Sequence, residues 1–186
     1  MRRRPAILLD RDGVINIDGP GYVESWDEFQ FCSGALKAIR KLTEAGWEIY
    51  VITNQSGVAK GLYSEQRLID MHWRMMIEVR RAGGQILGVE FCPHTDEDEC
   101  LCRKPRPGML LKAAAKWGID LERSYLVGDS ARDIQAGAAV GCTTFWVHTH
   151  YSDERTRQQR ADMVVAPDYE VTDLAKAVEI IMTRRL

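Results

Sequence analysis

The chain contains 186 residues, and its 25 Lys and Arg residues against 27 Asp and Glu residues give a formal net charge of −2. A hydrophobic fraction of 45% with 28% charged residues is ordinary for a folded globular domain and excludes a disordered chain. The lack of a basic excess argues against a nucleic-acid-binding surface, and the length suits a single domain over residues 1–186 with a small-molecule pocket.

The start of the chain does not have the pattern of a targeting segment. The apolar run after Met1-Arg2-Arg3-Arg4-Pro5 covers residues 6–9 and stops at Asp10, short of the ~7–15 residues of a secretory signal. No run approaches the ~18 apolar residues of a membrane span. We therefore expect a cytoplasmic protein with reduced thiols and no membrane partner. Because no long apolar surface stripe is evident, we also expect a monomer.

Short apolar runs alternate with helical patterns along the chain. The runs are apolar without alternation, which predicts strands buried on both faces, as in a parallel sheet. Strands are expected at residues 6–10, 48–53, 89–92, 125–129, 144–148 and 163–166. Helices are expected at residues 34–44, 64–81, 109–117, 131–140 and 171–184. This order predicts a doubly wound, Rossmann-like α/β fold that binds ligands beyond the carboxyl ends of its strands.

Polar sequences follow several of these strands, at the edge where ligands are expected. Extended backbone has a period of two, so Asp10 and Asp12 can aim at the same side while Arg11 points away. With Asp129 from another strand end, they form a set of carboxylates that suits Mg²⁺. A carboxylate nucleophile beside Mg²⁺, with a second carboxyl that moves a proton, suits phosphoryl transfer through an aspartyl phosphate. Taken alone, an Asp-x-Asp sequence would more often be a pair of helix caps or turn residues.

Three cysteines and one histidine cluster after the third predicted strand. Cys92-Pro93-His94 is followed by five residues and then by Cys100-Leu101-Cys102. A Cys₃His set is a regular structural zinc site that leaves no open position for catalysis. Residues 95–99, between the two halves, are acidic and contain no apolar side chain that could form a core, so a metal would order this loop. Lys104 follows two residues after Cys102, so the metal would also brace the segment that carries Lys104. The alternative is a reduced cysteine cluster without metal.

Four of these segments together resemble the motifs of the haloacid dehalogenase-like (HAD) phosphohydrolases, from about Ile7 to Val165. They are Asp10-Arg11-Asp12-Gly13, Thr53-Asn54, Lys104 and Gly128-Asp129-x-x-x-Asp133. The resemblance implies that Asp10 is the nucleophile and Asp12 the general acid and base. Thr53 and Lys104 would neutralise the phosphoryl oxygens, and Mg²⁺ would be held by Asp10, Asp129 and the backbone carbonyl of Asp12. Asp133 would orient Lys104 or a metal-bound water.

Within that superfamily the sequence is similar to the zinc-containing D-glycero-D-manno-heptose 1,7-bisphosphate 7-phosphatases. The matching segments are residues 9–16, Gly21-Tyr22-Val23, Thr53-Asn54-Gln55-Ser56-Gly57-Val58-Ala59, Cys92-Pro93-His94 and Cys102-Arg103-Lys104-Pro105-x-Pro107-Gly108-Met109. The resemblance implies a small phosphorylated sugar as substrate, in the synthesis of nucleotide-activated heptose for lipopolysaccharide or S-layer precursors. It also implies that Arg103 binds the second phosphate, for which a planar guanidinium is apt. The sugar site would include Asp18, Gly21, Tyr22, Asn54, Gln55 and Ser56.

Three alternatives remain at this stage. The five-residue zinc gap is closer to the histidinol-phosphate phosphatases, whereas Gly21-Tyr22-Val23 and residues 55–59 favour the heptose phosphatases. A phosphotransferase or nucleotide-directed phosphatase could use the same scaffold. An inactive zinc-braced binding module is disfavoured because Asp10, Asp12, Lys104 and Asp129 are all present. The short segment between the first strand and the first helix leaves little or no room for a cap domain.

Overall fold

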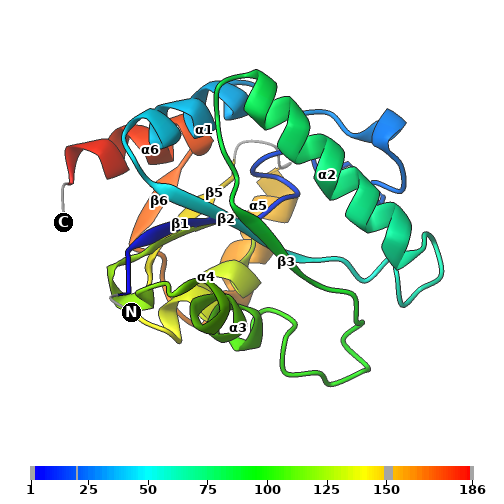
Figure 1. Ribbon diagram of the computed structural model, residues 1–186. Helices are drawn as coiled ribbons and strands as arrows, with labels where there is room; N and C mark the ends of the chain where they lie inside the picture. Colours follow the sequence, from blue (N-terminus) through cyan, green and yellow to red (C-terminus); the bar gives the residue numbers. More distant parts are fainter. Residues whose placement is uncertain (1–2, 20, 149–152, 185–186) are drawn as a thin grey trace.

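A six-stranded parallel sheet forms the centre of the computed structural model, which describes residues 3–19, 21–148 and 153–184 (Figure 1). The order of the strands across the sheet is β3-β2-β1-β4-β5-β6, and every neighbouring pair is parallel. The strands are β1 (Ala6–Leu9), β2 (Glu48–Asn54), β3 (Gly88–Cys92), β4 (Tyr125–Gly128), β5 (Thr143–Val147) and β6 (Tyr169–Val171). The order reverses at β1, so the carboxyl ends of β1 and β4 flank the crevice where doubly wound sheets bind ligands.

Helices cover both faces of the sheet. They are α1 (Ala35–Glu44), α2 (Glu65–Arg81), α3 (Gly108–Trp117), α4 (Ala131–Ala138), α5 (Asp153–Asp162) and α6 (Leu174–Thr183). Helices α1, α2 and α6 lie on one face, and α3 and α4 lie on the other (Figure 1). Strand β1 shows the period-two rule, because Ile7 and Leu9 pack in the core of the first face while Ala6 and Leu8 pack in the core of the second. The predicted doubly wound α/β fold is therefore confirmed.

The segment between β1 and α1 carries a single 3₁₀ turn, η1 (Trp26–Glu28). The rings of Trp26, Phe29 and Phe31 pack together beside this turn, with the first two stacked at 4.9 Å between centroids. Within the described ranges no additional domain stands over the carboxyl edge of the sheet, as the short segment predicted. Among all the residues that the structure describes, no helix has the length and apolar character needed to cross a membrane.

Two predictions near the carboxyl end of the chain are wrong. Residues 163–166 form no strand, and Val164 is 84% exposed there. The last strand is instead β6, whose Tyr169 stacks on Phe145 at 4.6 Å between ring centroids. Helix α5 was not predicted, because its sequence has no apolar face from which a period could be read. The last helix also begins later than predicted, at Leu174, where the Asp173 carboxylate accepts a hydrogen bond from the Lys176 amide.

Helix α3 offers a matched test of how far core packing stabilises the fold. Leu110 is fully buried, whereas its neighbour Leu111 is 53% exposed. We expect Leu110→Ala to lower the free energy of unfolding by about 2–5 kcal/mol, because it leaves a cavity between α3 and the sheet. Leu111→Ala should change it by less than about 0.5 kcal/mol. Urea titration followed by circular dichroism measures both, and equal effects would contradict this packing.

Candidate active site

Three buried carboxylates meet at the crevice between β1 and β4. Asp10 directly follows β1, Asp129 directly follows β4, and Asp133 lies in the first turn of α4. One oxygen of each lies within 4.8 Å of the others, a spacing that suits a shared cation. Burial, together with the neighbouring carboxylates, raises the pKa of Asp10 to about 7 and the pKa of Asp129 well above its usual value. Apolar burial and mutual repulsion thus leave this cluster in need of positive charge.

Gly13 is required beside this cluster. Its backbone has a φ of +77°, and a Cβ atom added there would lie 2.1 Å from Oδ2 of Asp129. Only glycine combines this backbone conformation with so close an approach. The turn after β1 therefore passes directly against the Asp129 carboxylate.

Lys104 supplies a buried positive charge to the carboxylates. Its Nζ lies 3.1 Å from Oδ1 of Asp10, contacts Oδ1 of Asp133, and donates to the carbonyl of Ile52 at 2.8 Å. Although burial disfavours the ammonium form, Asp10 and Asp133 raise the pKa of Lys104 above its usual value. The other oxygen of Asp133 accepts from the amide and hydroxyl of Ser130, which caps α4. Asp133 therefore fixes the lysine against the start of that helix.

The Asp12 carboxylate stands apart from the other three, in a separate set of donors. It accepts hydrogen bonds from Arg11 Nη2 at 2.8 and 3.0 Å, from Asn16 Nδ2 at 2.9 Å and from Gln55 Nε2 at 2.7 Å. Burial favours the protonated form, but the charge of Arg11 and the hydrogen bonds from Arg11, Asn16 and Gln55 together lower the pKa of Asp12. The prediction that Arg11 points away from the site is therefore wrong. Its guanidinium folds back onto Asp12 because a buried charge needs an ionic partner.

The ring of His72 contacts the Arg11 guanidinium, and this contact was not predicted from the sequence. Nη1 of Arg11 lies 3.3 Å from Nε2 of His72, and Arg11 is only 1% exposed. Burial and the charge of Arg11 lower the pKa of His72 to about 3, so the neutral ring can accept this hydrogen bond at Nε2. The available signal was a histidine within the apolar face of α2, beside Met71 and Met75.

A cavity of about 350 Å³ lies over these groups. It brings together eight of the predicted site residues: Asp10, Asp12, Asp18, Gly21, Tyr22, Asn54, Gln55 and Asp129. Two more lie against its lining: Ser56 Oγ is 3.1 Å from the hydroxyl of Tyr22, and Thr53 Oγ1 accepts from Gln55 Nε2 at 3.0 Å. Lys60, which was not predicted, places its Nζ 5.2 Å from the centroid of the Tyr22 ring.

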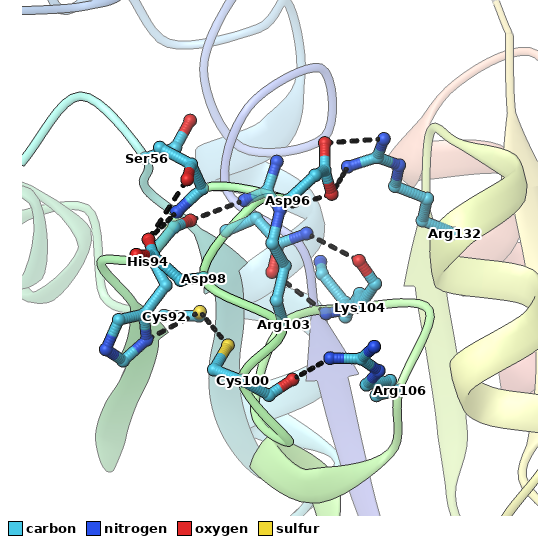
Figure 2. Close-up of polar contacts among 12 residues, drawn as sticks. Ser56, Cys92, His94, Asp96, Asp98, Cys100, Arg103, Lys104, Arg106 and Arg132 are labelled. Atoms are coloured by element: carbon cyan, nitrogen blue, oxygen red, sulfur yellow. Dashed lines mark hydrogen bonds and ion pairs between the residues drawn. The ribbon is translucent and has the colours of Figure 1, made fainter. Parts of the chain in front are cut away.

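The side chains of Cys92, His94, Cys100 and Cys102 converge, as Figure 2 shows for the first three. Cys92 Sγ lies 3.2 Å from Cys102 Sγ, 3.6 Å from Cys100 Sγ and 3.5 Å from Nδ1 of His94, and all of these cysteines are free. A tetrahedral ion with bonds of about 2.0–2.3 Å separates its ligands by about 3.3–3.8 Å. The separations lie in or just below this range, so the four atoms are close enough together to bind one tetrahedral metal ion. Arg103 does not line the cavity: its guanidinium contacts the loop between His94 and Cys100.

Comparisons with known proteins agree with this geometry. The sequence profile of a family described as HAD-hydrolase-like matches residues 101–177. The D-glycero-beta-D-manno-heptose-1,7-bisphosphate 7-phosphatase of Neisseria meningitidis is 48% identical over 135 residues, which cover 73% of this chain and 72% of that protein. The protein of the same name from Yersinia pestis is 38% identical over 183 residues, or 94% of this chain and 95% of that protein. This chain belongs to the D-glycero-beta-D-manno-heptose-1,7-bisphosphate 7-phosphatase family.

The family also includes a solved structure that overlays on nearly the whole chain. The D,D-heptose 1,7-bisphosphate phosphatase of B. bronchiseptica, solved with magnesium and phosphate, matches with a TM-score of 0.87 and 37% identity. The match covers 96% of this chain and 98% of that protein. Membership confirms the predicted superfamily and enzyme class, a HAD-type phosphatase, and supports the heptose family over the histidinol-phosphate family and the inactive binding module.

The carboxylate cluster predicts pH-dependent stabilisation by Mg²⁺. Above its raised pKa of about 7, Asp10 is ionised and destabilises the metal-free fold, and below that value protons relieve the repulsion. We expect Mg²⁺ to raise the Tm more at pH 8 than at pH 5.5, where it must displace protons. His72 titrates outside the cluster and affects samples with and without Mg²⁺ alike. Thermal melts measure this, with Asp129→Asn as the control that should lose the shift; an equal shift at both pH values would contradict it.

Proposed function

We propose that this chain hydrolyses the 7-phosphate of D-glycero-beta-D-manno-heptose 1,7-bisphosphate by a Mg²⁺-dependent reaction through an aspartyl phosphate on Asp10. The observation that carries the proposal is the placement of two carboxylates in different electrostatic settings around one cavity. Asp10 lies 3.1 Å from the Lys104 ammonium, while Asp12 is held separately by Arg11, Asn16 and Gln55. Such a pair suits a nucleophile and a proton carrier with separate roles. The names of the relatives support the substrate.

In the first step, an oxygen of Asp10 attacks phosphorus and the bond from phosphorus to the sugar oxygen breaks. The electron pair stays on that oxygen, which takes a proton from the Asp12 carboxyl; the negative charge of the bound phosphate favours the protonated form of Asp12 for this step. The ammonium of Lys104 and the hydroxyl of Thr53 neutralise charge on the phosphoryl oxygens, which is the main contribution that a protein makes to phosphoryl transfer. The fixed position of Lys104 between Asp10 and Asp133 supports this role.

In the second step, water attacks phosphorus, the bond to Asp10 breaks, and inorganic phosphate is released. Asp12, ionised after the first step, accepts the proton of that water and so regains the proton that it gave. Mg²⁺, held by the carboxylates of Asp10 and Asp129 and the backbone carbonyl of Asp12, would offset the repulsion between the Asp10 anion and the phosphate. Asp10 therefore carries the phosphoryl group from the first step to the second, and Asp12 first gives a proton and then accepts one.

We further propose that the sugar lies in the cavity lined by Asp18, Gly21, Tyr22, Asn54 and Gln55, with Ser56 at its edge and Arg103 on the second phosphate. The cavity volume of about 350 Å³ is at the small end for ligand sites, which suits a single sugar phosphate. The chain would act in the cytoplasm as a monomer and as one domain, in the supply of nucleotide-activated heptose. The single sheet shared by all described strands supports the one-domain proposal.

Finally, we propose that the Cys₃His cluster holds structural Zn²⁺. The four ligand atoms fit a tetrahedral ion and leave no position for substrate. Although burial favours the thiol, hydrogen bonding within the cluster lowers the pKa of Cys100 to about 7. Burial raises the pKa of Cys92 and Cys102, so a metal would have to displace the protons of those two thiols. Zinc there would order the loop that precedes Lys104.

The substrate proposal is tested by phosphate release in the presence of Mg²⁺. We expect kcat/KM for the heptose 1,7-bisphosphate to exceed that for L-histidinol phosphate by ~100-fold or more, because a site built for a second phosphate leaves its cations unpaired with the other substrate. Asp10→Asn should release no phosphate above background from either compound while keeping a normal melting curve. A preference for histidinol phosphate would overturn the substrate, and normal turnover by Asp10→Asn would overturn the mechanism.

The zinc proposal is tested by Cys100→Ser. We expect this variant to lose the zinc that metal analysis finds in the parent protein, and to lose ~10-fold or more in kcat/KM because the loop before Lys104 is released. Leu101→Ser is the matched control, since Leu101 is 80% exposed and lies between two ligands without being one. Zinc content equal in all three proteins, or absent from the parent, would contradict the proposal.

A further inference from the structure

The loop between His94 and Cys100 carries a carboxylate that joins two arginines from different parts of the fold (Figure 2). Oδ1 of Asp96 accepts from Arg103 Nε at 2.9 Å. The same carboxylate accepts from Arg132 Nη1 and Nη2, each at 3.0 Å. Arg132 is the second residue of α4, in the same turn as Asp133. Asp96 therefore links the loop of the Cys₃His cluster to the helix that carries a member of the carboxylate cluster.

Arg103 is held at a second point by the metal-ligating segment. Its Nη1 donates to the backbone carbonyl of His94 at 3.1 Å, and its side chain is only 13% exposed. Two bonds from Nε and Nη1 fix the plane of a guanidinium, because the group is rigid and flat. No described residue accepts a hydrogen bond from Nη2 of Arg103 in this arrangement.

The paired charges around Asp96 leave Arg103 able to take a further anion, although its guanidinium does not line the cavity. The pKa of Tyr22 is lowered first by its hydrogen bonds to Lys60 and Ser56, and the charge of Arg103 contributes to the same shift. Two arginines on one carboxylate leave a net charge of +1, which one further anionic group would neutralise. Without Asp96, the two guanidinium groups would repel each other and Arg103 would regain its rotamer freedom.

We propose that Asp96 is a positioning residue, which orients Arg103 so that its free edge meets the phosphate that is not hydrolysed, and that Arg132 holds Asp96 in place from α4. This inference rests on the proposed function. The gain is one of preorganisation: an arginine already held in its binding orientation loses less entropy when it grips a phosphate. Asp96 thus acts on substrate selection and leaves the bond-breaking groups unaffected.

The test compares two substrates that differ only in the second phosphate. We expect Asp96→Asn to lower kcat/KM for the heptose 1,7-bisphosphate by about 5- to 20-fold, mainly through KM, because bonds to charged groups of this kind are modest in strength. Turnover of the heptose 7-monophosphate should stay within about twofold of the parent protein. Asp98→Asn is the matched control, because it removes the same charge from the same loop but contacts Thr95 and no arginine.

Arg132→Gln provides a second variant that leaves the loop sequence unchanged. It should lower kcat/KM for the heptose 1,7-bisphosphate by less than Asp96→Asn does, because Asp96 keeps its bond to Arg103, and leave turnover of the 7-monophosphate nearly unchanged. Zinc content and melting curves of each variant show whether the loop is intact. If Asp96→Asn loses zinc, the comparison of the two substrates with Arg132→Gln tests the inference in its place.

The outcomes separate this inference from the proposed function. Equal losses on both substrates would show a purely structural role and overturn the inference. Equal losses in Asp96→Asn and Asp98→Asn would overturn it too, since loop charge alone would then explain the effect. A parent protein that hydrolyses both compounds equally well remains a phosphatase, but its Arg103 does not read the second phosphate and the inference fails. A parent protein inactive on both overturns the proposed function, and the inference with it.

Discussion

The buried ammonium of Lys104 is the contact on which the arrangement of the site depends. Asp10, Asp129 and Asp133 are buried together at one edge of the sheet, and burial raises the pKa of both Asp10 and Asp129. Lys104 binds Asp10 and Asp133 at once, so it joins the end of β1 to the start of α4. A divalent cation between Asp10 and Asp129 would complete the balance of charge. Electrostatics and fold are therefore coupled: the sheet brings the carboxylates together, and the lysine makes their proximity tolerable.

The loop that carries Lys104 is fixed by several hydrogen bonds, which hold the lysine in position at the carboxylates. The Asn54 side chain, at the end of β2, accepts from the Lys104 amide at 3.1 Å and donates to its carbonyl at 3.0 Å. Cys102, two residues before Lys104, belongs to the Cys₃His cluster, and the residue between them, Arg103, donates a hydrogen bond to Asp96. The position of Lys104 is thus set by contacts with the end of β2, with the loop of the Cys and His cluster and with the start of α4. A loop with so little apolar content can be this well ordered because polar bonds replace a core.

Much of this arrangement could be predicted from the sequence because it depends on local order. Apolar runs predict the central strands, and the groups that follow them meet at one edge in a parallel sheet, as Asp10 and Asp129 do. Contacts between distant side chains could not be predicted in the same way. The pairing of Arg11 with Asp12 was missed because the period of a strand gives only the direction of the Cα–Cβ bond. The guanidinium at the end of a long arginine side chain can still turn back to the other side of the strand. Helix α5 lacked any apolar period, and β6 is only three residues long.

The position of β1 in the strand order has a consequence for synthesis on the ribosome. This strand pairs with β2 on one side and with β4 on the other, and β4 begins at Tyr125, more than a hundred residues later in the chain. Until that segment emerges, β1 has an open edge made of fully buried residues, and Asp10 lacks the partners that the later half supplies. The edge that carries Asp10 and Asp129 is therefore complete only when the two halves of the sheet join, after the segment with β4 has been synthesised.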